Sequence, residues 1–264
     1  MHTRSSTRST PAHVDRATLL AAFDAELQPQ RFKDYGPNGL QVEGKARIGK
    51  IVSGVTASRA LIDAAIEVEA DALFVHHGLF WRGQDGTVTG WMKQRLQRLL
   101  AHDINLFAYH LPLDAHPTLG NNAQLGLRLG LVAEGRFGEQ ELGFIGRPAD
   151  GAPLADAAAL AQRLEKVLNR PVTRVGQAQA AIKKIAWCSG GAQSYFEAAI
   201  AAGAQAFITG EMSEPQAHLA RECGVLFYAC GHHATERYGA PALAAHVAAS
   251  LGVAHEFIDI DNPA

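Results

Sequence analysis

The sequence predicts an α/β protein with two similar halves, each containing a mixed, mostly parallel sheet flanked by helices. Three observations predict this class. Short apolar runs alternate with longer helical patterns along the chain, which is typical of βα units. The chain has 264 residues, of which 47% are hydrophobic and 19% are charged, so it can bury a sizeable core. The same order of apolar and polar segments also occurs twice.

The predicted elements follow from the spacing of the apolar residues, which recur every three to four positions in helices and form short continuous runs in buried strands. The first half contains predicted helices at 17–27, 58–69, 91–101 and 121–129, and predicted strands at 49–55, 72–76 and 104–109. A strand at 141–146 and a helix at 153–168 follow. The second half contains predicted strands at 183–188, 205–209, 225–229 and 254–259, and helices at 192–202, 214–222 and 234–250.

Composition divides the chain into four parts. The first sixteen residues are rich in Ser, Thr and Arg and have no acidic residue before Asp15, which predicts a disordered tail. An organellar transit peptide has a similar composition, but this segment lacks the apolar face of one. The predicted parts are the tail at 1–16, a first α/β half at 17–130, a Gly- and Ala-rich connecting segment or subdomain at 131–180, and a second half at 181–264; residues 17–264 can also count as one domain.

An internal duplication supports the two halves. The strand before His110 resembles the strand before His232, and both halves place a carboxylate four residues later, at Asp114 and Glu236. Apolar periodicity alone explains similar strands, but it does not explain the shared polar pair. We therefore expect the halves to face one another across a pseudo-twofold axis, with the polar ends of equivalent strands meeting at the centre.

Charge and cysteine content exclude several classes of protein. The net charge of −2 gives no overall attraction to nucleic acid, and the basic residues at 93–98 fit an exposed helical face. Three cysteines are too few for a disulfide framework, so we expect a reducing cytoplasm. No stretch reaches the roughly 18 uninterrupted apolar residues of a membrane span. We expect no membrane partner.

Polar side chains gather where three predicted strands end. The residues are His76, His77, His110, Asp114, His232 and Glu236. Ligands of open α/β sheets bind at the carboxyl ends of the strands, where loops supply side chains. Four imidazoles and two carboxylates suit two divalent cations per chain, such as Zn, Fe, Mn or Ni. Core packing disfavours such residues, so we predict a dinuclear metal centre.

The spacing of these residues gives further expectations. Adjacent side chains on a strand point in opposite directions, so His76 and His77 should reach different ions unless the strand has ended. The i,i+4 spacing of His232 and Glu236 puts both on one face at the start of a helix. Pro112 predicts a turn in the segment between the other two ligands.

Two further residues are candidates for proton transfer. Glu211 begins a predicted helix, where capping alone favours a carboxylate. It also occupies the position that corresponds to the turn after His76, so we predict that it faces the same centre as a general base. His233 either orients a ligand, carries a proton or is simply exposed.

For several other polar residues we do not expect metal binding as the main role. We expect hydrogen-bonded or surface roles, with no metal, for His102, His218, His246 and His255. For His116 two interpretations remain: it orients a ligand or carries a proton beside the metal ligands, or it is simply exposed. Cys230 can serve as a soft ligand, but we expect a small buried hydrophobe there.

Five strings give the sequence a family resemblance. They are GPNGLQVEG at 36–44, VHHGLFW at 75–81, YHLPLDAH at 109–116, TGEMSE at 209–214 and GHHATERYG at 231–239. Together they resemble the Nif-three-like family, whose members are also called type 2 GTP cyclohydrolase I homologues. The resemblance runs from about residue 19 to the C-terminal residue and matches the short form, without a large domain between the halves.

The resemblance implies more than the residues predict by themselves. It implies a dinuclear metal centre on the same six residues, and it implies a ring-shaped homohexamer whose metal sites face an internal cavity. The cyclohydrolase name implies a nucleotide-like substrate. Neither G-x-x-x-x-G-K-[ST] nor a well-placed G-x-G-x-x-G is present, although many nucleotide hydrolases lack both.

Three function classes compete. A metal-dependent hydrolase is favoured, since two neighbouring cations activate water and clamp the attacked group. In that hypothesis Glu211 or His233 moves protons, and Tyr109 or the Asn121–Asn122 pair binds a small-molecule substrate. A non-catalytic protein for metal storage, delivery or insertion would use the same six ligands. An interaction or nucleic-acid scaffold is disfavoured by the acidic balance.

Overall fold

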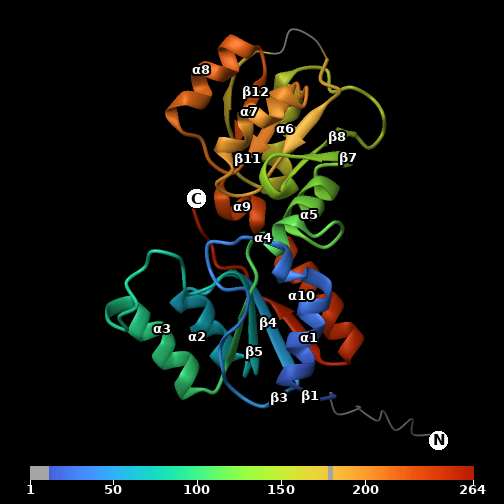
Figure 1. The fold of residues 1–264 in the computed structure, drawn as a ribbon. Helices are drawn as coiled ribbons and strands as arrows, with labels where there is room; N and C mark the ends of the chain where they lie inside the picture. Colours follow the sequence, from blue (N-terminus) through green and yellow to red (C-terminus); the bar gives the residue numbers. More distant parts are fainter. Residues whose placement is uncertain (1–11, 178–180) are drawn as a thin grey trace, which may run out of the picture.

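A computed structural model describes residues 12–177 and 181–264, in which two main sheets are flanked by helices (Figure 1). The predicted mixed α/β class is confirmed. Residues 1–11 of the predicted tail lie outside the described residues. None of the helices in the two described ranges combines the length and apolar character that crossing a membrane requires.

The first sheet has five strands, in the order β13–β4–β5–β6–β2. Its strands are β2 (Gly39–Val42), β4 (Lys50–Thr56), β5 (Ala72–His77), β6 (Asn105–Ala108) and β13 (Ala254–Phe257). All neighbours are parallel except β2, which runs antiparallel to β6. One apolar cluster joins the sheet to α1 (Arg16–Leu27) and α10 (Gly239–Leu251), and another joins it to α2 (Arg59–Glu67) and α3 (Gly90–Ala101).

The central strands are apolar throughout because both faces of this sheet are covered. Phe74 and Phe107 pack against Phe23 of α1, with ring centroids 4.5 and 5.5 Å from that of Phe23. Their neighbours Leu73 and Leu106 are fully buried in the cluster of α2 and α3. Successive strand residues thus reach opposite cores.

The second sheet has six strands, in the order β7–β8–β10–β11–β12–β9. Its strands are β7 (Leu131–Phe137), β8 (Gly143–Pro148), β9 (Thr173–Val175), β10 (Ile185–Trp187), β11 (Ala206–Thr209) and β12 (Leu226–Ala229). Strands β10, β11 and β12 are parallel, and the other pairs are antiparallel. Helices α5 (Asn121–Arg128) and α6 (Ala157–Leu168) pack in one cluster, and α7 (Phe196–Ala201) and α8 (Glu214–Cys223) in another.

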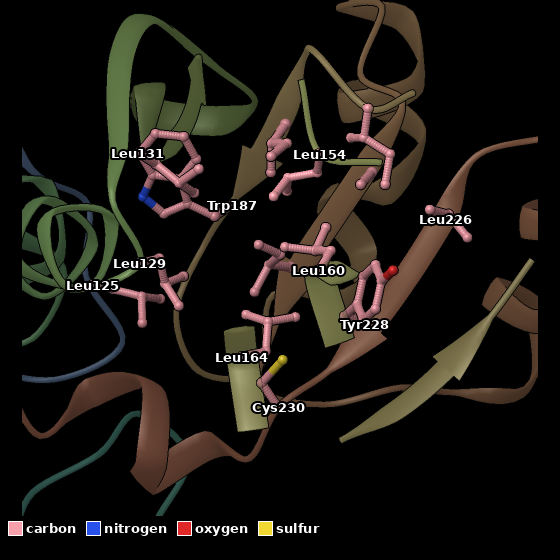
Figure 2. Close-up of a cluster of buried hydrophobic side chains, with 14 of the residues drawn as sticks. Leu125, Leu129, Leu131, Leu154, Leu160, Leu164, Trp187, Leu226, Tyr228 and Cys230 are labelled. Atoms are coloured by element: carbon pink, nitrogen blue, oxygen red, sulfur yellow. The ribbon is translucent and has the colours of Figure 1, made fainter. Parts of the chain in front are cut away.

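Figure 2 shows the cluster beneath α5 and α6. Leu160 and Leu164 of α6 are fully buried together with Trp187 and Tyr228 of the sheet. Cys230 is also fully buried there, which confirms the prediction of a small buried hydrophobe.

The remaining elements are short. Strands β1 (Val14–Asp15) and β3 (Arg47–Ile48) pair with each other as a separate antiparallel sheet, and the others are the helices α4 (Leu111–Ala115) and α9 (His232–Glu236) and the 3₁₀ turns η1 (Pro29–Arg31), η2 (Glu139–Glu141) and η3 (Gln193–Tyr195). Figure 1 shows α4, α5 and α9 between the sheets. The loops that carry the predicted ligands therefore lie where the two halves meet.

Sheet membership corrects three predicted boundaries. Strands β7, β8 and β9 join the second sheet, so residues 131–177 are not a separate connection or subdomain. Strand β13 comes from the predicted second half but pairs with β4 of the first sheet. Residues 12–16 are not disordered, because they contain β1 and the first residue of α1. In each case the deciding contact is with a segment distant in sequence.

Two predicted elements are also divided differently. The helix predicted at 234–250 is two helices, α9 and α10, with a break at Arg237 and Tyr238. The turn predicted at Pro112 is the five-residue helix α4, with the proline in its first turn, where a missing N–H costs no helical hydrogen bond.

The internal duplication is visible in the strand order. Strands β4, β5 and β6 are parallel neighbours in chain order, as are β10, β11 and β12. In each sheet an antiparallel strand, β2 or β9, lies beyond the third. A pseudo-twofold relation between the halves stays a prediction.

Asp71 ties the start of β5 to the corner before β4. Its carboxylate accepts hydrogen bonds from Lys45 Nζ at 2.6 Å and from the amides of Gly49 and Lys50 at 2.8 and 3.1 Å. Burial alone would raise the pKa of Asp71, but these bonds and the Lys45 charge lower it below its usual value. The ionised carboxylate therefore stabilises the folded state at neutral pH.

We expect Asp71→Asn to lower the free energy of unfolding by about 1 kcal/mol at pH 7. Because the folded pKa is depressed, the wild-type advantage is complete above the unfolded value near 3.9 and is lost as pH falls through the folded value. Urea unfolding at a series of pH values measures this difference. The exposed Asp261→Asn is the control; equal losses in both variants, or a gap that persists in acid, would contradict the prediction.

Candidate metal centre

The six predicted ligands lie in one cluster between the two sheets. His76 and His77 end β5, His110 precedes α4, Asp114 lies in α4, and His232 and Glu236 are the first and last residues of α9. Three sets of side chains have ligand atoms within 4.8 Å of one another: His76 with His77 and His110, His77 with His232 and Glu236, and His76 with Asp114 and Glu236. Each set is large enough to hold a metal ion.

The local geometry decides how the paired residues are used. The rings of His76 and His77 have centroids only 4.4 Å apart, although both residues belong to β5 and His77 still pairs with Thr56 of β4. The two rings therefore do not diverge as strand geometry predicts. Helix α9 places His232 Nε2 3.2 Å from Glu236 Oε2, as the i,i+4 spacing predicts.

The Nδ1 atom of each of the four imidazoles contacts an oxygen atom of a residue outside the six predicted ligands. The contacts are His76 to the Tyr109 carbonyl at 3.2 Å, His77 to Thr56 Oγ1 at 3.1 Å, His110 to Asp34 Oδ1 at 2.7 Å and His232 to Glu211 Oε1 at 2.6 Å. Carbonyl and carboxylate oxygens only accept, so Nδ1 of His76, His110 and His232 carries the proton. Their Nε2 atoms are therefore the ones that a metal would bind, in place of the proton that each carries when the ring is charged.

Glu236 lies at the middle of the cluster. Its Oε1 is 3.4 Å from His76 Nε2, and its Oε2 is 3.3 Å from His77 Nε2. Among the residues that the structure describes, neither His76 Nε2 nor Glu236 Oε2 has a hydrogen-bond partner, although both atoms are buried. Unsatisfied buried donors and acceptors are costly, and a cation between them removes that cost. The site therefore fits a metal.

The electrostatics of the cluster also favour cations. Burial opposes charge on His76, yet the carboxylates of Asp114 and Glu236 raise its pKa to about 9. Burial likewise opposes charge on His232, whose close approach to the carboxylates of Glu236 and Glu211 raises its pKa to about 9. Burial lowers the pKa of His77 to about 3, which leaves that imidazole neutral and able to donate a lone pair. Two buried carboxylates thus attract positive charge to this point.

Asp34 is a residue of the candidate site that the sequence analysis missed. Its Oδ1 accepts from His110 Nδ1 and from the Tyr35 amide, and its Oδ2 accepts from Asn38 Nδ2 and the Leu111 amide, both at 2.9 Å. Burial raises the pKa of Asp34, but these bonds lower it further than burial raises it. A carboxylate that orients a metal-binding histidine in this way is a common outer contact.

We expect Asp34→Asn to weaken metal binding by about tenfold, since the residues behind metal ligands typically contribute ten- to a hundredfold. The variant removes the charge that faces His110 and one acceptor, while the side chain keeps its size. Competition with a fluorescent chelator measures the affinity. Asp63→Asn is the matched control, because Asp63 is paired with Arg98 on the surface. Equal affinity in the wild type and Asp34→Asn would exclude an orienting role.

Glu211 lies at the rim of the cluster, where its side chain is 47% exposed. Its Oε1 contacts His232 Nδ1, and its Oε2 is 3.4 Å from Gln193 Nε2. The contact puts Glu211 beside the predicted ligands. The second oxygen is accessible to water, so the residue can orient His232, carry a proton or do both.

The structure does not bring His233 into the cluster. Its Nε2 is 2.9 Å from Asp259 Oδ1, and its amide donates to the Ala264 carbonyl at 3.1 Å. One residue along a helix turns the side chain by about 100°, so the neighbour of a ligand points away from it. The prediction that His233 moves protons at the centre is wrong for this geometry.

Three residues predicted to bind substrate are structural instead. The Tyr109 hydroxyl is fully buried and donates to Asp24 Oδ1 at 2.6 Å. Asn121 donates to Asp114 Oδ1 at 2.9 Å, and Asn122 donates to the Asp114 carbonyl at 3.2 Å. Both asparagines are fully buried, so they support α4 and leave no amide for a substrate.

Five further histidines lie outside the cluster, most of them in contact with a side chain elsewhere in the fold. His218 pairs with Glu214, His246 and His116 both pair with Glu26, His255 contacts Ser53 Oγ, and His102 follows the last residue of α3. In the described part of the chain none of them lies in a metal-sized group. His116 therefore contacts Glu26 and does not belong to the candidate metal centre.

Comparisons with known proteins identify the family. The model of the Duf34/NIF3 family, NGG1p interacting factor 3, matches residues 14–263. The chain belongs to the Duf34/NIF3 family. The resemblance of the five sequence strings is thereby confirmed. The family match covers both sheets and all six predicted ligands.

Similar proteins match this Duf34/NIF3 chain over nearly the full length of both sequences. A protein of Neisseria meningitidis serogroup A is 53% identical, covering 95% of this chain and 100% of the relative, and one of Pseudomonas aeruginosa is 48% identical, covering 94% and 98%. Both are called GTP cyclohydrolase 1 type 2 homolog. The solved structure of protein ybgI, whose function is described as unknown, is 45% identical with a TM-score of 0.91 and covers 95% of this chain and all of its own. A solved structure from Thermus thermophilus is 34% identical with a TM-score of 0.86 and the same coverage.

Proposed function

We propose that the chain binds two divalent cations through the six clustered residues and hydrolyses a small molecule with them. The carrying observation is the pair of buried atoms, His76 Nε2 and Glu236 Oε2, that have no hydrogen-bond partner in the described residues at the centre of six candidate ligands. Zn, Fe, Mn and Ni all suit mixed imidazole and carboxylate ligands. The name of the relatives points to cyclohydrolase chemistry on a nucleotide-like substrate.

The residues divide into holding and orienting roles. His76, His77, His110, Asp114, His232 and Glu236 hold the ions. When bound, two such ions supply Lewis acidity and lower the pKa of water. Asp34 fixes the ring of His110, and Glu211 fixes the ring of His232. His76, Asp114 and Glu236 are buried, which strengthens the charge interactions on that side of the site.

Glu211 is the residue that we assign to proton transfer. It is the exposed carboxylate in contact with the cluster, so it reaches both the cluster and solvent. An exposed carboxylate can accept a proton near the centre and release it to water. The contact with His232 also couples its charge to that of a ligand.

The first experiment pairs metal analysis with a hydrolase screen. Protein purified without affinity metal is analysed for bound elements and tested on nucleotides, amides and phosphoesters. We expect about two ions per chain in the wild type and in Glu211→Gln, with turnover at least about a hundredfold lower in the variant, since general-base catalysis contributes about 10²–10⁴. Glu214→Gln, at the exposed first residue of α8, is the control. Two ions without turnover and with rapid loss to a chelator would overturn the hydrolase in favour of metal storage or delivery.

The assembly is a separate part of the proposal. The family resemblance supports a ring-shaped homohexamer with the metal sites facing an inner cavity. Analytical ultracentrifugation is expected to give a mass near six times the 28.2 kDa of one chain. A monomer or dimer at micromolar concentration would contradict the ring.

A further inference from the structure

Two turns next to the cluster are locked to one another. The Arg82 amide donates to the Tyr35 carbonyl at 2.6 Å, and Arg82 Nη2 donates to the Asp34 carbonyl at 2.6 Å. The backbone of the two turns approaches so closely at Gly36 that a Cβ there would lie 2.4 Å from the Phe80 carbonyl oxygen. The turns are therefore a fixed structure beside the cluster.

These turns place two aromatic rings against the predicted ligands. The Trp81 ring centroid is 5.0 Å from that of His110, edge-on at 89°, and 5.9 Å from that of His77. The Tyr35 ring centroid is 6.0 Å from that of His110. Tyr35 is 58% exposed and Trp81 is partly exposed, so core packing does not account for them. Large aromatic side chains at a surface opening favour ligand contact.

The same residues line an open cavity of about 350 Å³. Its lining is Asp34, Tyr35, Gly36, Pro37, Phe80, Trp81 and Arg82. A narrow recess shares four of these residues and also includes His76 and His110. The recess holds only about 10 Å³, so the cavity lies beside the candidate ligands, and its own size is that of a small-molecule site.

The charge of the cavity is positive on its outer side. The Arg82 side chain is exposed, and the arginine–carboxylate ion pairs in the described part of the chain, those of Arg16, Arg98, Arg147 and Arg237, do not include it. The Asp34 carboxylate is buried and is engaged by His110, Tyr35, Asn38 and Leu111. It therefore offers little free charge to the cavity, whereas Arg82, whose Nη2 donates to the Asp34 carbonyl, keeps its other N–H groups for an anion.

We propose that this cavity binds the planar aromatic ring of a negatively charged small molecule, with Trp81 and Tyr35 contacting the ring and Arg82 the anionic group. The three residues then select the substrate of the adjacent centre, so this inference rests on the proposed function. Aromatic faces bind any planar ring by stacking, whereas the guanidinium restricts the choice to anions.

The test uses metal-free protein in a chelator, so that a phosphate cannot bind through metal. Isothermal titration calorimetry compares guanosine 5′-monophosphate, guanosine and ribose 5-phosphate. We expect the nucleotide to bind at least about tenfold more tightly than ribose 5-phosphate, because stacking one base contributes about that much or more. Trp81→Ala should lose about tenfold in nucleotide affinity, and Trp81→Phe should keep most of it. Arg82→Gln should weaken the nucleotide but not guanosine.

The control is Trp91→Ala, which removes an equally large, 54% exposed ring that does not line the cavity. Equal binding of the nucleotide and ribose 5-phosphate, or unchanged affinity in Trp81→Ala, would overturn the proposal. A third outcome would also overturn it: the wild type binds no ligand, and Trp81→Ala has a lower oligomer mass. In that case the Trp81 and Tyr35 rings pack against a second copy of the chain. Metal content of the wild type is measured in parallel. A wild type that holds metal but does not bind the ring refutes this inference alone, and a wild type without metal that binds the ring refutes only the metal centre.

Discussion

Alanine in place of Glu236 is expected to reduce bound divalent metal to background. Glu236 belongs to two of the three candidate ligand groups, and its two oxygens face the Nε2 atoms of His76, His77 and His232. Removing it takes away a negative charge and a donor shared between those groups. The loss of affinity should exceed the roughly ten- to hundredfold effect of an outer residue.

Elemental analysis and chelator competition measure this loss. Glu236→Gln keeps the side-chain volume and removes only the charge, so it tests whether metal loss comes from the charge or from unfolding. We expect this variant to fold and to bind metal far more weakly than the wild type. Glu222→Ala, an exposed glutamate of α8, is the control. If Glu236→Ala folds and retains the wild-type metal content, the centre lies elsewhere.

Gly190→Ala is expected to destabilise the fold by about 3 kcal/mol and to displace Glu236. Gly190 has a φ of +67°, which is unfavourable for alanine, and the added Cβ would lie 1.9 Å from Glu236 Oε1. The backbone cannot move aside easily, because the Gly190 amide donates to Thr235 Oγ1 and its carbonyl accepts from Gly210. The loop before η3 therefore needs glycine for both conformation and space.

Gly224→Ala provides a matched control for that prediction. Gly224 ends α8 with nearly the same φ, +66°, but a Cβ there would meet nothing within 4 Å. Its cost should be about 1 kcal/mol, the conformational part alone. Urea unfolding gives both values, and metal content should fall only in Gly190→Ala. Equal costs in the two variants would show that the loop tolerates a methyl group beside Glu236.

Local sequence signals predicted the parts of the fold that depend on near neighbours. The strands at β5 and β6 are apolar over most of their length because both faces are buried, and that run is visible without a structure. The residues at their carboxyl ends could be selected because ligands of such sheets bind there. The i,i+4 pair of His232 and Glu236 is likewise a property of one helical turn.

Errors arose where side-chain direction or long-range pairing decides. His233 is adjacent to a predicted ligand, but the rotation of α9 turns it to Asp259. Tyr109 and Asn122 lie in or near the family-like strings, yet they face the core, which no local pattern reveals. Asp34 was missed because it contacts His110 from 76 residues away. Its signal in the sequence, an aspartate just before GPNG, is too common to single out.

The α/β class, the duplicated strand order and the six clustered candidate ligands could all be read from the chain, because they depend on periodicity and on where strands end. Three features required the folded molecule: β13 joins the first sheet, residues 131–137 and 143–148 extend the second, and Asp34 contacts Nδ1 of His110. Strand pairing and side-chain contacts between distant segments depend on how the whole chain packs, and a local pattern carries no record of the partner.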